Sequence, residues 1–260
     1  MKKFVALLLA ALMVASLCAC GQKGTGSDLQ TVTKGKLIMS TNAEFAPYEY
    51  VADDGKGFQG TGYEGIDIEI AYALAQKLGL ELVVDNMDFD AALSAVQTGK
   101  SDMVAAGVTV TPDRLNAMSF TDSYANGVQV VIVKEGSDIK SIDDLQGKKI
   151  GTQRGTTGYI YCSDDFGDEN VVAYDDGLTA VQALNNGQVD AVVIDNEPAK
   201  AYVESTTGLK LLDTKYAEEE YAICVSKNNV ELLGKVSAAL QDLIADGTVQ
   251  AIVDKYITAE

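Results

Sequence analysis

Hydrophobic and polar positions follow two alternating rhythms along the chain, and these rhythms predict helices and strands in turn. Ile66, Ile70 and Leu74 recur every fourth residue and mark one face of a helix that ends at Gly79. Short apolar segments on either side have the length and boundaries of buried strands. The pattern predicts strands over 37–40, 80–84 and 103–106 and a second helix over 89–97. This βαβαβ order predicts a mostly parallel sheet with helices on its faces.

The same order starts again in the second half of the chain. Strands are predicted over 149–153, 171–174 and 190–194, with helices opening at 155 and running over 178–185. The segments AVQTGKSDMV, from Ala95, and ALNNGQVDAV, from Ala183, lie 88 residues apart and share a helix end, a glycine, an aspartate and an apolar strand. Ordinary helix-turn-strand sequences can also produce such a match. In either case Gly107 and Asp195, also 88 residues apart, fall at equivalent strand ends.

Two such halves predict a cleft. In open parallel sheets a ligand binds beyond the carboxyl ends of the strands, where nothing covers the crevice. Two sheets that face each other would place the stretch Gly107–Arg114 on one wall and Asp195 on the other. We therefore expect an α/β fold of two lobes, with a binding cleft between them.

The N-terminus has the features of a targeting sequence. Residues 1–19 begin with Lys2 and Lys3 and continue with an apolar run too short for a membrane span, which is typical of a secretory signal peptide. The end of this segment, LCAC, resembles the lipobox of bacterial lipoproteins, with Cys20 as the acylated residue; simple secretion is the alternative. Residues 20–33 are polar and glycine-rich, so we expect a flexible tether and a folded part from about Lys34.

Composition excludes several classes of partner. The formal charge of −18 becomes −20 when the two lysines of the signal are removed, so nucleic acid and anionic lipid head groups are poor partners. The chain has no histidine, and its acidic residues lack the spacing of a calcium loop, so we expect neither a metal site nor a cofactor. For Cys162 and Cys224 we favour free buried thiols over a disulfide.

The stretch GVTVTPDR, residues 107–114, carries the groups that hold a small carboxylate. The guanidinium of Arg114 can donate two hydrogen bonds to both oxygens of a carboxylate. Thr109 adds a hydroxyl, and Gly107 lets the backbone approach a ligand closely. The alternative is structural: Thr111 caps a short helix and Arg114 lies solvated on its face.

A second anion-binding element is the segment QRGTTG, residues 153–158. It lies where a strand turns into a helix, and the free N–H groups of a helix start attract negative charge. Thr156 and Thr157 add hydroxyls there, although an ordinary threonine cap is an equal alternative. Asp195 follows a buried strand and can accept an ammonium group, with a helix N-cap as its alternative. Together these groups match the head of a zwitterionic amino acid.

Several motifs in order carry a family resemblance. TNAEFAPYEY, GYEGIDIEIAYALAQKLG, FDAALSAVQTGKSDMV, GVTVTPDR, FTDSYA, DLQGKKIGTQRGTTG and GQVDAVVIDN resemble the amino-acid-binding proteins of bacterial ABC importers, the extracellular solute-binding family 3. The resemblance runs from about residue 36 to 256. It implies a type II periplasmic-binding-protein-like fold, with lobe 1 over 34–124 and 225–260 and lobe 2, with the hinge strands, over 125–224.

The resemblance also implies roles for the candidate residues. Arg114, the Thr109 hydroxyl and the Thr157 backbone would hold the ligand carboxylate, with Thr156 beside them. Asp195 and the Gly107 carbonyl would hold the α-ammonium. The ligand would lie between lobes that close about strands near 124–128 and 221–225, and a membrane permease would receive it. The protein would be a monomer, lipid-anchored through Cys20 to the outer face of the cell membrane. Further ligand-facing positions are Phe45, Phe89, Gln153 and Asn42; for the two phenylalanines plain core packing is the alternative.

The ligand itself is less defined. Family members that bind cationic amino acids commonly have an acid where Asn42 stands, and glutamine-binding members have Lys and His where Gln153 and Ile194 stand. Glu44 could restore a negative charge, although a surface glutamate is the simpler interpretation. We favour a polar uncharged amino acid over lysine or arginine. The alternatives in function are an enzyme of the same fold, such as a dehydratase or lyase, and a ligand-sensing domain.

Overall fold

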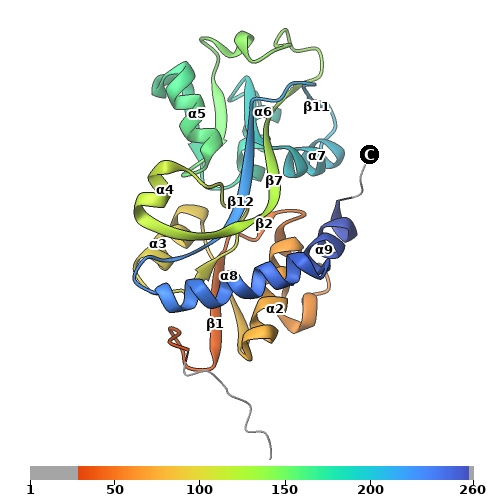
Figure 1. Ribbon diagram of the computed structural model, residues 1–260. Helices are drawn as coiled ribbons and strands as arrows, with labels where there is room; N and C mark the ends of the chain where they lie inside the picture. Colours follow the sequence, from red (N-terminus) through yellow and green to blue (C-terminus); the bar gives the residue numbers. More distant parts are fainter. Residues whose placement is uncertain (1–28, 258–260) are drawn as a thin grey trace, which may run out of the picture.

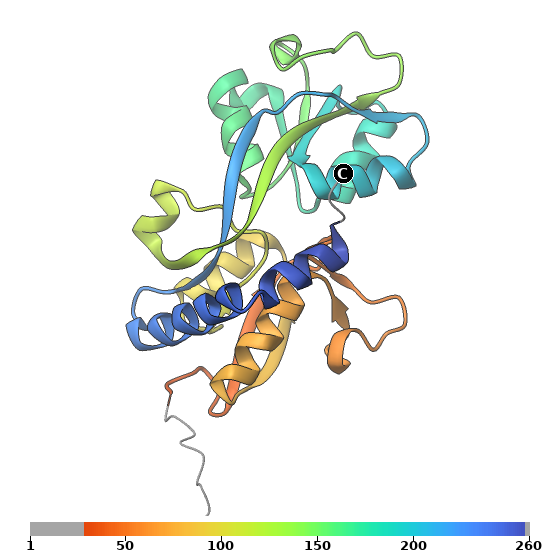
Figure 2. The same ribbon diagram turned by 45° about the vertical axis from the view of Figure 1, so that its right-hand side comes forward.

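The computed structural model describes residues 29–257, and their elements gather into two lobes joined by two long strands (Figures 1 and 2). The predicted signal peptide and Cys20 lie outside the described residues. Lobe 1 contains strands β1 (Lys36–Thr41), β2 (Glu44–Phe45), β3 (Glu49–Val51), β4 (Tyr63–Glu64), β5 (Glu81–Asn86) and β6 (Met103–Val104), and helices η1 (Phe58–Gly60), α2 (Ile66–Leu78), α3 (Phe89–Gln97), α4 (Pro112–Ala117), α8 (Val230–Ala245) and α9 (Thr248–Tyr256). Lobe 2 contains strands β8 (Ile150–Gln153), β9 (Val171–Tyr174), β10 (Ala191–Asp195) and β11 (Leu209–Leu211), and helices η2 (Asp143–Leu145), α5 (Thr157–Phe166), η3 (Asp168–Asn170), α6 (Gly177–Asn185) and α7 (Asn196–Ser205).

Strands β7 (Met118–Lys134) and β12 (Ala217–Ser226) run antiparallel through both lobes and connect them. The sequence predicts two separate sheets, whereas these two strands join the ladders into one sheet with the order β5-β1-β6-β12-β7-β10-β8-β9. The reason is the length of β7, which pairs with β12 along much of its course and with β10 at its far end. The predicted boundaries at 124/125 and 224/225 fall inside these strands and remain predictions.

Within each lobe the parallel strands follow one plan. In lobe 1 the first strand, β1, lies between β5 and β6, and in lobe 2 the first strand, β8, lies between β9 and β10. The two segments that match in sequence, from Ala95 and from Ala183, each run from the end of a helix, α3 or α6, into a strand, β6 or β10. Asp102 accepts a backbone hydrogen bond from Ile38 at 2.8 Å, and Asp190 accepts one from Lys149 at 2.8 Å. The shared aspartate therefore pins the start of the neighbouring strand in each lobe, which is a structural role.

The core continues from one lobe into the other. A single cluster of buried apolar side chains includes Leu37 and Ile70 of lobe 1, Val192 of lobe 2, and Tyr48 and Tyr221 between them. Two smaller buried clusters, one under α3 and one under α5, lie on the other side of the sheet from this cluster. Helices thus cover both faces of each ladder, as the apolar strand segments predict.

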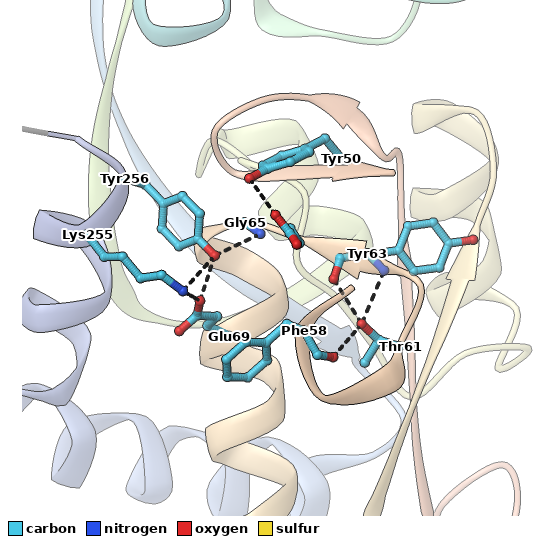
Figure 3. Close-up of polar contacts among 9 residues, drawn as sticks. Tyr50, Phe58, Thr61, Tyr63, Gly65, Glu69, Lys255 and Tyr256 are labelled. Carbon is cyan, nitrogen blue, oxygen red and sulfur yellow. Dashed lines mark hydrogen bonds and ion pairs between the residues drawn. The ribbon is translucent and has the colours of Figure 1, made fainter. Parts of the chain in front are cut away.

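The ends of the described chain pack on lobe 1. Leu29 is buried and the Val32 N–H donates to Asp102 at 2.8 Å, so ordered contacts begin ahead of the expected start near Lys34. At the other end, α9 is held against α2 (Figure 3): the Tyr256 hydroxyl bonds Glu69 at 2.6 Å, and Lys255 forms an ion pair with the same carboxylate. Within residues 29–257 no helix has both the length and the hydropathy to cross a bilayer.

Candidate functional site

A cavity lies between the lobes and brings the predicted residues together. About 320 Å³ within it is free of protein atoms, part of this open to solvent. All ten candidate ligand residues line it, joined by two that the sequence did not single out, Glu49 and Ala106. The lining comprises Asn42, Phe45, Glu49, Phe89, Ala106, Gly107, Thr109, Arg114, Gln153, Thr156, Thr157 and Asp195.

The sheet order explains why these residues meet. In each lobe the strand order reverses beside the first strand, and the crevice at the carboxyl end of such a switch point is where open sheets bind ligands. Asn42 follows β1 and Gly107 lies beyond β6, at the switch point of lobe 1. Gln153 ends β8 and Asp195 ends β10, at the switch point of lobe 2. The cavity lies where these two edges face each other.

Arg114 combines the two roles that the sequence left as alternatives. Thr111 caps α4 by accepting a hydrogen bond from the Arg114 N–H at 3.2 Å, so the helix cap is real. The Arg114 side chain is nevertheless buried, with 8% of its surface exposed. Its Nη1 donates to the Thr109 carbonyl at 2.9 Å and its Nη2 to the Gly155 carbonyl at 3.1 Å. Because Gly155 belongs to lobe 2, Arg114 bridges the lobes.

The surroundings of Arg114 favour anion binding. Its guanidinium carbon lies 5.4 Å from the centre of the Phe89 ring, which is a cation–π contact. Burial lowers the pKa of Arg114 from its usual value, although an arginine remains charged at neutral pH. Two carbonyls take up two of its five N–H donors, so donors remain for a carboxylate.

Asp195 is the buried acid of the opposite wall. It stands at the N-cap position of α7, yet its side chain makes no capping bond, so the capping alternative is not realised. Its carboxylate instead accepts from Gln129 Nε2 at 2.9 Å and from the Tyr221 hydroxyl. Burial, and then the charge of Glu219, raise its pKa to about 8. A nearby cation such as an ammonium would stabilise the ionised form.

Thr109 differs in detail from its expected role. Its hydroxyl donates to Glu219 Oε2 at 3.2 Å, and Gln129 Nε2 donates to the same oxygen at 3.0 Å. A hydroxyl has one proton, so Thr109 would have to exchange this bond before donating to a ligand carboxylate. The sequence did not indicate Glu219 or Gln129, since both lie on the long strands that join the lobes.

The lobe 2 wall is the start of α5. Thr156 is its N-cap, accepting from the Tyr159 N–H at 3.3 Å and donating to the Gln153 carbonyl at 2.8 Å. The capping alternative for Thr156 is therefore realised, while Thr157 lies buried at the first helical position. The Gln153 side-chain amide donates across the cleft to Asn42 at 2.8 Å. The first N–H groups of α5 have no partner within the helix and can accept an anion.

Aromatic rings and one glycine shape the floor of the cavity. Phe45 stacks on Tyr48 with ring centres 5.7 Å apart, and Tyr48 itself is buried. Gly107 has a positive φ of 54°, and a Cβ there would lie 2.9 Å from the Phe45 ring. Only glycine combines this backbone with this contact without strain.

Glu49 is the polar residue that the sequence missed. It is 1% exposed, it lines the cavity, and neither of its carboxyl oxygens has a hydrogen-bond partner among residues 29–257. A single glutamate between two tyrosines in a short segment carries no periodic signal, so nothing in the sequence distinguishes it from a surface residue. Glu44, the other acid near this segment, is exposed and does not line the cavity.

Within residues 29–257, Cys162 and Cys224 form no disulfide, and both thiols are buried, in agreement with the favoured interpretation. Burial raises the pKa of Cys162 to about 12. In the described part of the chain, no three acidic or thiol side chains cluster as a metal ion would need.

Comparisons with known proteins agree with this architecture. The family model of the bacterial extracellular solute-binding proteins, family 3, matches residues 37–259. The arginine-binding extracellular protein ArtP of Bacillus subtilis is 33% identical over the whole of both chains, and a probable histidine-binding protein of Neisseria gonorrhoeae is 31% identical over all of this chain and 97% of its own. An ancestral arginine-binding protein bound to glutamine is 38% identical, with a TM-score of 0.80 over 87% of this chain and 100% of its own.

These similarities confirm the expected α/β fold class and place the chain among proteins that bind solutes outside the cytoplasm, not among enzymes. The family match covers nearly all of the described residues. The chain belongs to the bacterial extracellular solute-binding proteins of family 3.

Proposed function

We propose that this protein is the extracytoplasmic binding component of an ABC importer and that it captures a free L-amino acid between its lobes. One observation carries the proposal: a buried guanidinium and a buried carboxyl line the same interlobe cavity. Arg114 would bind the α-carboxylate and Asp195 the α-ammonium. Each such charge-assisted bond contributes ~1.5–3 kcal/mol, so four or five suffice for a micromolar complex at ~8 kcal/mol.

Capture would proceed by closure of the lobes. The hinge would lie in β7 and β12, near 124–128 and 221–225. In support, the pairing of these strands shifts register between Tyr221 and Ala222 and again before Cys224, which breaks the regular ladder and eases bending there. Hydrogen bonds across the cleft already join the two lobes. Arg114 donates to the Gly155 carbonyl, the Gln153 amide to Asn42, and the Tyr202 hydroxyl to the Glu44 carbonyl.

The closed protein would then deliver the amino acid to a permease in the membrane. Acylation of Cys20 would hold the protein at the outer face of the cell membrane and raise its effective concentration beside that permease. Replacing Cys20 with alanine should move the protein from the membrane fraction to the soluble fraction. Retention of that variant at the membrane would contradict the anchor.

Two classes of ligand side chain are candidates, polar uncharged and cationic. Asn42, where cationic-ligand members carry an acid, favours the first class. The names of the relatives favour the second, although one solved structure is of an ancestral arginine-binding protein bound to glutamine and another of an ancestral arginine-binding protein bound to arginine. We keep the polar uncharged class as our proposal at neutral pH.

A thermal-shift screen of the protein against the common L-amino acids tests this function. A ligand at a thousand times its dissociation constant stabilises by ~4 kcal/mol, which is a large shift. For each ligand found, the α-amide and the N-acetyl derivative serve as controls. The first removes the carboxylate charge that Arg114 would bind, and the second removes the ammonium charge that Asp195 would bind. We expect both derivatives to lose the shift. No shift with any amino acid would refute the proposed function.

A further inference from the structure

Glu49 and Asp67 form a pair of buried carboxyl groups at the edge of the cavity. Glu49 is 1% exposed and Asp67 is fully buried, and only Glu49 lines the cavity. Both oxygens of Glu49 and Oδ1 of Asp67 lack a hydrogen-bond donor in the part of the chain that the structure describes. Three buried carboxyl oxygens without donors would be costly if both groups were ionised, because each buried charge needs compensation.

The backbone holds the two groups together. The Asp67 N–H donates to the Tyr48 carbonyl at 2.9 Å, and Tyr48 directly precedes Glu49. Gly65, before α2, lies so close to the same carbonyl that a Cβ would collide with it. The start of α2 is therefore fixed against the segment that carries Glu49, which brings the two carboxyl groups close together.

Two carboxylates are both acceptors, so this contact is a hydrogen bond only when one of them carries a proton. Asp67 is the better site for the charge. It lies in the first turn of α2, where the helix dipole favours an anion, and its Oδ2 accepts from the Gly107 N–H at 3.0 Å and the Tyr124 hydroxyl at 2.8 Å. Glu49 receives no hydrogen bond from any described residue. The proton thus belongs on Glu49, pointing at the free oxygen of Asp67.

The charges around the pair agree with this assignment. The titratable groups that face Glu49 are Asp67 from α2, Asp195 from β10, and the hydroxyls of Tyr48 and Tyr124. Among the described residues no basic side chain forms an ion pair with Glu49 or Asp67. Burial raises the pKa of Asp67 to about 6, and burial together with Asp67 raises the pKa of Glu49 well above its usual range.

We propose that Glu49 carries a proton that it donates to Asp67, and that this proton decides which ligand side chains the cavity accepts. The inference rests on the proposed function. With the proton in place, the free oxygen of Glu49 is a neutral acceptor, suited to the N–H of an amide or a urea. A cationic side chain gains a full ion pair with Glu49 only when the proton leaves to solvent, so its binding releases one proton. Asp67, outside the cavity, acts as a positioning residue for that proton.

This coupling makes the choice of ligand depend on pH. While Glu49 is protonated, the affinity for a cationic ligand relative to its uncharged isostere should rise up to tenfold for each pH unit, because one more proton is released. Asp195 also changes its ionisation when an α-ammonium binds, but it does so equally for both ligands. The ratio of the two affinities therefore isolates Glu49.

The test compares L-arginine with L-citrulline, in which an uncharged urea replaces the guanidinium. Isothermal titration calorimetry from pH 6 to 8, in two buffers of different ionisation enthalpy, gives the affinity ratio and the number of protons released. We expect the ratio to rise by more than tenfold over this range, with up to one more proton released by arginine. A ratio that stays constant would overturn the shared proton.

Two variants and one control sharpen the result. Glu49→Gln imitates the protonated acid, since its amide can donate to Asp67, and it should make the affinity ratio independent of pH. Asp67→Asn should ionise Glu49, because its amide donates to that carboxylate, and should raise the ratio at pH 6. Glu44→Gln, at the exposed rim, should leave the pH dependence in place. A pH-dependent ratio that survives Glu49→Gln, or citrulline binding without arginine binding throughout the range, would refute the proposal. Failure of every amino acid to bind would instead refute the proposed function.

Discussion

Replacing Arg114 with lysine keeps the positive charge of the cavity and removes the planar fork. The chain contains two arginines, and they offer a matched comparison. Arg114 is buried and donates to carbonyls on both lobes. Arg154 lies half-exposed on lobe 2 and forms an ion pair with Asp175 at 3.5 Å. Arg114→Lys should therefore weaken amino-acid binding, and Arg154→Lys should not.

The expected loss follows from the bonds that lysine cannot make. A guanidinium binds a carboxylate through two parallel charge-assisted bonds, whereas an ammonium donates along one direction at a time. The loss of one such bond costs ~1.5–3 kcal/mol, which is about a 10- to 140-fold rise in the dissociation constant. Arg154 forms an exposed ion pair, which is worth ~0–1 kcal/mol to stability, and it does not line the cavity. Arg154→Lys should therefore bind the ligand as tightly as the unchanged protein does.

Calorimetric titration with the amino acid found by the thermal-shift screen measures both dissociation constants directly. Tyrosine provides the intrinsic fluorescence of this chain, which has no tryptophan, so heat is the more direct signal. Equal affinity for Arg114→Lys and the unchanged protein would refute the carboxylate clamp. A loss of the same size in Arg154→Lys would show that the effect does not depend on the buried position of Arg114, and would also refute the clamp.

Three further predictions concern backbone strain, ionisation and the C-terminal helix. Gly107→Ala should weaken ligand binding and also cost ~1–2 kcal/mol of stability, because the added methyl group would meet the Phe45 ring. Gly99→Ala is the control, since Gly99 also has a positive φ, 71°, but a Cβ there would have nothing within 4 Å. This control should lose stability in a melting curve and keep its affinity in a titration. The raised pKa of Asp195, about 8, means that the empty folded protein binds more protons than the unfolded chain between about pH 4 and 8. Urea denaturation should therefore show that the free energy of unfolding falls by up to ~1.4 kcal/mol for each unit that the pH rises within this range, and that it falls less steeply in Asp195→Asn. Tyr256→Phe should cost ~1 kcal/mol in the melting curve by removing the bond to the α2 glutamate, whereas Tyr72→Phe, whose hydroxyl has no hydrogen bond among the described residues, should cost little; equal losses would refute the role of the Tyr256 hydroxyl.

Local pattern was a good guide to the individual elements. The fourfold spacing from Ile66 predicts α2 with its end at Gly79, and the helix over 89–97 agrees with α3. These elements are decided by short-range periodicity and by glycine at positive φ, both of which are visible in a line of residues. The continuous sheet was not visible there, since the pairing of β7 with β12 joins residues about a hundred positions apart.

The same division holds in the cavity. Sequence reasoning brought forward Arg114 and Asp195 because each lies where a predicted strand ends, next to recognisable turn chemistry. Glu49 was not visible in the sequence because the groups that surround it include Asp67 of α2 and Tyr124 of β7, which lie apart from it along the chain. The engagement of Thr109 was not visible either, because the carboxyl that accepts its hydrogen bond, Glu219, lies on the connecting strand.

By itself the sequence determined the order of strands and helices, the two-lobed plan, the family and the residues that converge on the cavity, because periodicity, turn residues and motif order are local properties. The tertiary structure alone decided which polar groups are already engaged and which buried carboxyl lacks a donor. Whether an acid such as Glu49 holds a charge or a proton depends on the groups that surround it in space, and those groups come from segments that the sequence keeps far apart.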